Sequence, residues 1–230
     1  MKYILTVLIL YIILLTPKVE AAQNIFYFDM PTVQKNYLGL NYSYNTRQTE
    51  FFFGHRKNIE FNKYFITYSL PLTHKYKMEV SAGTGDVDIS SRKSSANDLT
   101  AVKLGFEKNI GGDSVVFSQW KVNITLEGGY TTLSNYKQSE IDIAYEYIKG
   151  DLALAVAKEF GFTVPFAGLN YYYGKDFFEE KSTSEKSENK INGISPFVGA
   201  IIRISDNILI RASANFLDQQ GYGGGFNLVF

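Results

Sequence analysis

The stretch "QWKVNITLEGGY" (residues 119–130) alternates apolar and polar side chains at almost every position. A period of two is the spacing of a β-strand, because successive side chains of a strand point to opposite faces of its sheet. The stretch therefore predicts a strand with one apolar and one polar face. The apolar face carries Trp120, Val122, Ile124, Leu126 and Tyr130, and the polar face carries Lys121, Asn123, Thr125 and Glu127.

The same alternation recurs along the chain, and no segment after residue 22 repeats apolar residues at helical spacing for more than a turn or two. It is seen in "YFITYSL" (64–70), "YKMEVSAG" (76–83), "TAVKLGFEK" (100–108) and "NILIRASANF" (207–216). A soluble β-sandwich also alternates, but its strands are shorter than these segments of about 9–12 residues, which match tilted strands crossing a bilayer. The pattern predicts an all-β fold, a closed antiparallel transmembrane β-barrel.

Turns assigned backward from Phe230 predict ten strands, with short turns at one end and longer polar loops at the other. The expected strands are 37–45, 59–70, 75–89, 97–108, 116–133, 139–159, 163–174, 194–204, 206–217 and 221–230, with 179–190 as a long loop. In "EYIKGDLALAV" (146–156) the apolar residues change from odd to even positions. A bulge there keeps ten strands. A true turn would make twelve strands, and merging weak segments would make eight.

The N-terminus has the pattern of a secretory signal peptide. Lys2 precedes the apolar run "YILTVLILYIILLT" (3–16), Pro17 ends the run, and "VEA" offers small residues before a cleavage point after Ala21. The run is too short to cross roughly 30 Å of hydrocarbon. We therefore predict a signal peptide over 1–21, an N-terminal periplasmic segment over 22–36 and a barrel over 37–230. The chain would be exported by the Sec route to the bacterial outer membrane.

The stretch "GYGGGFNLVF" (221–230) resembles the C-terminal signal of bacterial outer-membrane barrels, in which aromatic or apolar residues alternate up to a terminal Phe. The resemblance implies recognition by periplasmic chaperones and the barrel-assembly machinery. The residues that carry it are Tyr222, Phe226, Leu228 and Phe230.

A second resemblance covers "VPFAGLNYYYG" (164–174) and "SPFVGAIIRISDNILIRASANF" (195–216). Both look like the strands of small porin-like barrels of the opacity-protein and OmpW-like group. The resemblance implies a porin-like architecture and is nearly silent about activity.

Charged side chains on the polar faces are expected to point into the lumen. Two interpretations remain open: an ion-pair network that fills a narrow barrel, and a selective pore lined by charge. Inward Phe166, Tyr172 and Phe197 favour the filled lumen. The charged residues are Lys77, Glu79, Lys103, Glu107, Lys121, Glu127, Arg203 and Arg211.

Composition limits the function classes. The net charge is zero, which gives no reason to expect nucleic acid as a partner, and the chain has no Cys and two His. No cofactor or metal site is expected, because no ligand spacing is present. We expect a non-enzymatic envelope or surface role, in contact with outer-membrane lipid and lipopolysaccharide, with a possible host or environmental ligand at outer loops such as 175–193. The alternatives are a narrow conduit and, third, an outer-membrane hydrolase based on His55.

Overall fold

The computed structural model describes residues 36–50, 56–73, 75–89, 96–110, 120–138, 141–181, 183–217 and 220–230. The predicted signal peptide and most of the predicted periplasmic segment, residues 1–35, lie outside this part of the chain. Within it, no helix is long and apolar enough to cross a membrane.

Ten antiparallel strands form one closed barrel, in which each strand pairs with its neighbours in sequence and β1 pairs with β10. The predicted fold class and strand number are confirmed, so the alternatives of eight and twelve strands are wrong. The strands are β1 Tyr37–Glu50, β2 Arg56–Pro71, β3 Tyr76–Ile89, β4 Ala96–Asn109, β5 Trp120–Gln138, β6 Ile141–Lys158, β7 Thr163–Glu180, β8 Glu185–Ser205, β9 Ile208–Asn215 and β10 Gln220–Val229.

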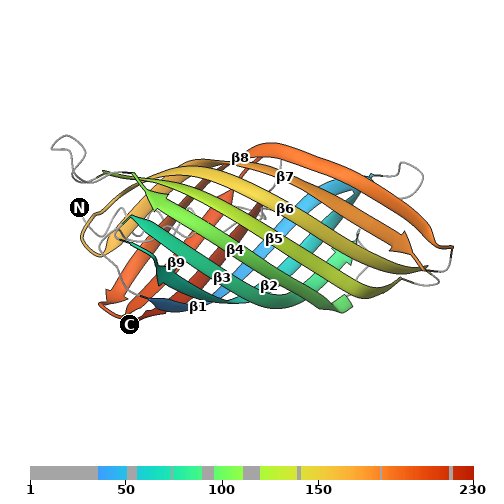
Figure 1. Ribbon diagram of the computed structural model, residues 1–230, viewed down its shortest axis with the longest axis horizontal. Coiled ribbons are helices and arrows are strands. Elements are labelled where there is room, and N and C mark those ends of the chain that lie inside the picture. Colours follow the sequence, from blue (N-terminus) through green and yellow to red (C-terminus); the bar gives the residue numbers. More distant parts are fainter. Residues whose placement is uncertain are drawn as a thin grey trace, which may run out of the picture.

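The two ends of the barrel differ (Figure 1). We call the end that holds the C-terminus the proximal end. The start of β1 pairs with the end of β10 there, Tyr37 opposite Val229, and the Phe230 N–H donates to the Asn36 carbonyl at 3.0 Å. The opposite end, reached by the β7–β8 hairpin, is the distal end. A closed ring leaves no sheet edge exposed at the height where all ten strands are paired.

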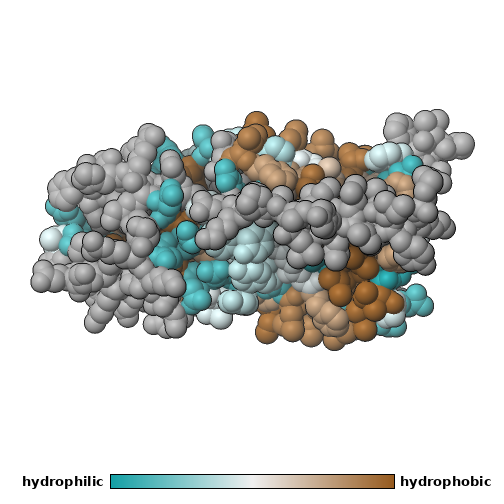
Figure 2. Space-filling view, turned by 180° about the vertical axis from the view of Figure 1, so that it is seen from behind, coloured by the Kyte–Doolittle hydropathy of each residue, from teal (hydrophilic) through white to brown (hydrophobic). Residues whose placement is uncertain are grey.

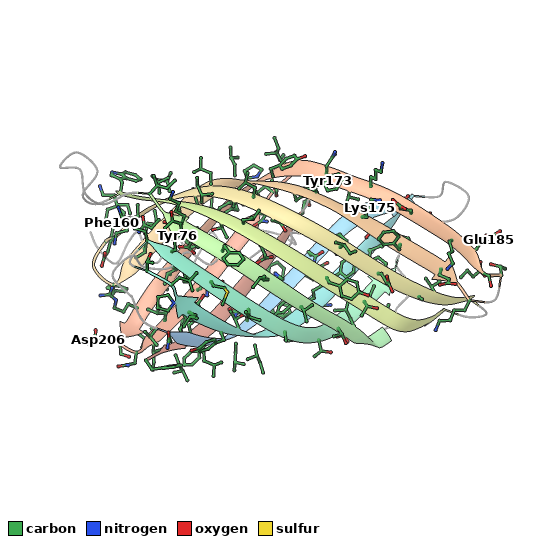
Figure 3. All side chains as sticks on the ribbon, in the orientation of Figure 1. Tyr76, Phe160, Tyr173, Lys175, Glu185 and Asp206 are labelled. Carbon is green, nitrogen blue, oxygen red and sulfur yellow. The ribbon has the colours of Figure 1, made fainter. Side chains whose placement is uncertain are left out.

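An apolar belt surrounds the proximal half of the barrel, and Figure 2 shows its hydrophobic atoms gathered on that half. Figure 3 places Tyr76 and Phe160 at the proximal end, and Tyr173, Lys175 and Glu185 successively closer to the distal end. A belt of this kind is the surface that a bilayer covers. Every strand contributes at least one exposed apolar residue to it: Leu40, Ile66, Val80, Leu104, Leu126, Leu154, Leu169, Val198, Ile210 and Phe226.

Strand β6 shows how the surface changes toward the distal end. Its even residues point outward throughout, with Leu152 and Leu154 exposed in the belt, whereas the odd residues Tyr145 and Tyr147 are buried in the lumen. The β6–β7 register runs unbroken from Ile143 to Ala157, so the bulge predicted within 146–156 is wrong. The apolar residues change face because the strand leaves the apolar belt: beyond it the outer surface meets water and the inner surface becomes the core.

The β7–β8 hairpin corrects a second prediction. Residues 179–190 were expected to form a long loop, but β7 continues to Glu180 and β8 begins at Glu185. The two strands are 18 and 21 residues long, whereas β9 and β10 have 8 and 10 residues. The expectation of about 9–12 residues per strand fits only the membrane-crossing part. The excess length of β7 and β8 extends the distal end.

Two apolar clusters occupy the lumen. The proximal cluster consists of Tyr37, Ala153, Ala155, Ala157, Val164, Phe166, Phe197, Ile201, Leu209 and Val229. The distal cluster consists of Ile59, Phe61, Phe65, Val87, Leu99, Ala101, Leu133, Ile143, Tyr145, Tyr147 and Phe178.

Two reciprocal glycine–phenylalanine pairs shape the proximal cluster. Gly168 lies opposite Phe197 and Gly199 lies opposite Phe166 in the β7–β8 register. A Cβ atom on Gly168 would come within 2.5 Å of Phe197 Cζ, and one on Gly199 would come within 2.5 Å of the Ala212 carbonyl oxygen. Glycine is required here because the aromatic rings lie directly over the backbone.

Candidate functional site

A charged layer lies in the lumen between the two apolar clusters. Inward positions on β3, β4, β5 and β6 supply most of its charges, because alternate residues of each strand face the interior. Buried charges need partners, since removing them from water is unfavourable.

The first network of this layer is centred on Lys77. Its Nζ lies 2.8 Å from Glu79 Oε1 and 3.2 Å from Glu107 Oε2. The Tyr37 hydroxyl donates to Glu79 Oε1, and Asn123 Nδ2 donates to Glu107 Oε1 at 2.6 Å. Strands β1, β3, β4 and β5 are thereby connected through one buried cation and two carboxylates.

The second network lies further along the same strands and continues onto β6 and β7. Lys103 Nζ lies 3.2 Å from Glu127 Oε1, and Lys149 Nζ lies 2.8 Å from Asp151 Oδ1. Asn170 Nδ2 donates to Asp151 Oδ1 at 2.9 Å. Each of the two pairs joins one cation to one carboxylate.

Neutral polar groups and the cation of Arg211 complete the layer on the side of β1, β2, β9 and β10. Asn41 Nδ2 donates to Thr67 Oγ1 at 2.9 Å, and Thr67 Oγ1 is 2.8 Å from Ser81 Oγ. Arg211 Nη2 donates to Asn227 Oδ1 at 3.3 Å.

Two of the predicted lumen residues lie apart from the layer, at the proximal mouth. Lys121 Nζ is 3.3 Å from Glu159 Oε2, and Arg203 Nη2 is 3.6 Å from Glu159 Oε1. Glu159 follows β6 in the short turn before β7. The structure therefore brings six of the eight predicted residues into the charged layer and gives the other two a shared carboxylate at the rim.

Sequence reasoning missed several residues of the lumen. Lys149 and Asp151 were passed over because they fall where the apolar face of β6 changes, although they share the odd parity of Tyr145 and Tyr147. Lys63 was missed because it precedes the stretch 64–70, yet parity with Phe65 places it inside. Its Nζ donates to Thr131 Oγ1 at 3.1 Å and lies 4.9 Å from the centroid of the Phe61 ring.

The layer holds strands together by paired charges. A selectivity filter uses rings of one sign, whereas here each carboxylate lies against a cation or an amide. Within the described ranges, no group of three or more His, Cys, Asp or Glu could hold a metal ion. His55 and His74 both lie outside those ranges, and so does the hydrolase alternative based on His55.

Comparison with known proteins shows the fold. No family model matches the chain, and no curated protein matches it. The translocator domain of autotransporter NalP from Neisseria meningitidis is 10% identical, with a TM-score of 0.53, over 86% of this chain and 88% of that one. The COG4313 outer membrane channel from Pseudomonas putida F1 is 12% identical, with a TM-score of 0.53, over 94% of this chain and 100% of that one.

A third solved structure is similar over almost all of its length. The outer membrane protease OmpT from Escherichia coli is 9% identical, with a TM-score of 0.50, over 90% of this chain and 99% of that one. The chain thus has the fold of the bacterial outer-membrane β-barrels. At sequence identities this low, the similarity shows the fold alone, because one barrel architecture serves unrelated functions.

Proposed function

We propose that this protein is a non-conducting, non-enzymatic barrel of the bacterial outer membrane that acts at the cell surface, as an adhesin-like or structural envelope protein. The distal end faces the outside of the cell, and the apolar belt lies in the membrane. Strands β7 and β8, 18 and 21 residues long, project beyond the apolar belt at the distal end, and the proximal connections 72–75, 159–162 and 206–207 are short. Both features support this orientation, because the extracellular parts of outer-membrane barrels are longer than most of their periplasmic turns.

The observation that carries the proposal is an aromatic contact across the lumen. Phe61 is on β2 and Tyr145 is on β6, four strands apart around the ten-strand ring, yet their ring centroids are 5.7 Å apart. Tyr145 also lies 5.0 Å from the Phe178 ring on β7. Rings in contact across the barrel leave no path for hydrated ions between them, because protein interiors of this kind are close-packed.

The charged layer supports the same proposal. Lys63 on β2 reaches Thr131 on β5, and Tyr37 on β1 reaches Glu79 on β3. Ten-stranded barrels are narrow, and side chains nearly fill barrels of about eight strands. The proposal also includes a closer similarity to opacity-protein and OmpW-like barrels, supported by the Pro-aromatic-x-Gly pattern that begins at Pro165 and at Pro196. It further includes export by a signal peptide, lipopolysaccharide as the surrounding lipid, and assembly through residues 221–230.

Single-channel recording in planar bilayers tests the proposal against a narrow conduit. The protein, with insertion verified by its heat-dependent mobility in SDS, is expected to give no conductance steps. Arg211→Ala is the matched variant, because Arg211 lines the lumen without belonging to either apolar cluster, and it should be equally silent. Regular steps in the unmodified protein that change in Arg211→Ala would show a conducting lumen and overturn the proposal.

A further inference from the structure

Among the residues that the structure describes, the distal part of β8 is an open sheet edge. From Glu185 to Ile194 none of its residues is buried, whereas the β7 residues Asp176 and Phe178 opposite them are. The pairing of β8 with β9 begins only at Phe197, opposite Asn215. In the part of the chain that the structure describes, no strand pairs with β8 between Lys186 and Asn192 on the side away from β7.

The direction of the backbone groups along this edge follows from one hydrogen bond. The Phe216 N–H donates to the Pro196 carbonyl at 2.9 Å, so the main-chain groups of Pro196 point toward β9. In an antiparallel strand alternate residues direct both N–H and C=O to the same side. The main-chain groups of Lys186, Glu188, Lys190 and Asn192 therefore point away from β7, along the open edge.

The edge lies beyond the apolar belt and carries a defined charge pattern. Its outward side chains from residue 186 to 192 are polar, and Ile194 is the first exposed apolar one. Glu188 is held by Lys175 at 2.5 Å. Lys190 lies opposite Lys175 in the β7–β8 register, and no carboxylate among the described residues forms an ion pair with it. A carboxylate on an added strand, placed opposite Lys190, would offset the repulsion between Lys190 and Lys175.

A second copy in the same membrane does not fit this edge. Barrel strands tilt by about 35–45° from the membrane normal. Two copies related by an axis along that normal would present their β8 strands crossed by twice the tilt, about 70–90°, too far from antiparallel for a ladder. The edge instead suits a segment that approaches from the aqueous side.

We propose that β8 residues 186–192 bind an extended polypeptide by strand addition, in antiparallel orientation, with a carboxylate opposite Lys190 and an amine opposite Glu188. Main-chain hydrogen bonds supply affinity in this mode, and the alternate side chains supply selectivity. The inference deepens the proposed surface role and rests on it, since it names an extended segment of another polypeptide as the partner class.

A synthetic peptide with the sequence of residues 185–194, "EKSENKINGI", is the probe. Paired antiparallel about its residue 189, it places its Glu opposite Lys190 and its Lys opposite Glu188. The intact barrel in nanodiscs is expected to bind it. N-methylation of the peptide at positions 188 and 190 removes donors that face the edge and should weaken binding by more than about tenfold. N-methylation at 187 and 189 leaves those donors in place and should preserve binding.

Two variants of the protein test the edge itself. Asn192→Pro removes an edge-facing N–H without breaking a bond to β7, and proline is tolerated on sheet edges. It should abolish peptide binding, whereas Asn192→Thr should retain it, and both should keep the heat-dependent mobility of the folded barrel. The inference would be overturned if the peptide did not bind at about 1 mM. It would also be overturned if methylation at 188 and 190 had the same effect as methylation at 187 and 189 and Asn192→Pro left binding unchanged. Either result leaves the bilayer recordings unaffected, so the two proposals fail separately.

Discussion

Lys149 and Asp151 point into the lumen from the same face of β6, and Lys149 Nζ lies 2.8 Å from Asp151 Oδ1. Both side chains are almost fully buried, at 5% and 2% exposure. A buried pair of this kind is weak evidence for net stabilisation, because desolvation of both charges opposes their attraction. Loss of one partner, in contrast, leaves an uncompensated charge in the interior.

Asp151→Asn is therefore expected to lower the free energy of unfolding by about 3–5 kcal/mol, the usual effect of removing one member of a buried pair. Urea unfolding of the barrel in lipid vesicles, followed by tryptophan fluorescence, measures it. Glu188→Gln is the control, because it breaks the exposed Lys175–Glu188 pair and should change the free energy of unfolding far less. Equal effects of the two substitutions would contradict the burial argument.

The glycine–phenylalanine pairs of the proximal cluster give a second prediction. Gly199→Ala places a methyl group against the Phe166 ring and within 2.5 Å of the Ala212 carbonyl oxygen. Overpacking at such a site costs about 1–3 kcal/mol. Gly128→Ala is the matched control, since no atom lies within 4 Å of a Cβ at that position. The two urea midpoints should separate, with Gly199→Ala the lower, and coincident midpoints would show that the ring moves aside freely.

The alternation of side chains made the closed barrel and the inward charges predictable. The alternation of side chains along a strand does not depend on which strands lie beside it. Lys77, Glu107 and Glu127 could therefore be assigned to the lumen from their odd or even position in the strand alone. Partner identity was not predictable. The contact of Tyr37 with Glu79 joins β1 to β3, and such a contact depends on strand tilt and register.

The distal half was misread for a physical reason. Parity in β6 never changes, but the environment does: outside the belt the exterior meets water, so apolar residues such as Tyr145 move to the inner face. The prediction of a bulge assumes that lipid covers the outer face of β6 along its whole length. Residues 179–190 are predicted as a loop because nearly all of them are polar, which is the composition of a loop, whereas in the structure 185–190 form the start of β8 with none of them buried.

Adjacent phenylalanines at the end of β7 give a third prediction. Phe178 is 1% exposed in the distal cluster and contacts Tyr145, whereas Phe177 points outward beside Lys175, whose Nζ is 6.0 Å from its ring centroid. Phe178→Ala should lower the free energy of unfolding by about 3–5 kcal/mol, as for other buried aromatic truncations. Phe177→Ala should lower it by much less, because Phe177 is only half-buried on the outer face and its cation–π contact with Lys175 is weak. Similar losses in urea unfolding would mean that the distal cluster is not a packed core.

The terminal aromatic residue gives the last prediction, on assembly. Phe230 is 61% exposed at the proximal rim, and its only described main-chain bond, from its N–H to the Asn36 carbonyl, survives truncation of the ring. Phe160 is exposed to a similar degree at the same end but lies in a turn, outside the C-terminal strand. Phe230→Ala and Phe160→Ala should therefore shift the urea midpoint of refolded protein by similar small amounts, because both lose comparable contact with lipid. In cells, only Phe230→Ala is expected to lower the amount of heat-modifiable barrel in the envelope, because the proposed assembly signal includes Phe230. Equal envelope levels of the two variants would place that signal elsewhere than in the terminal ring.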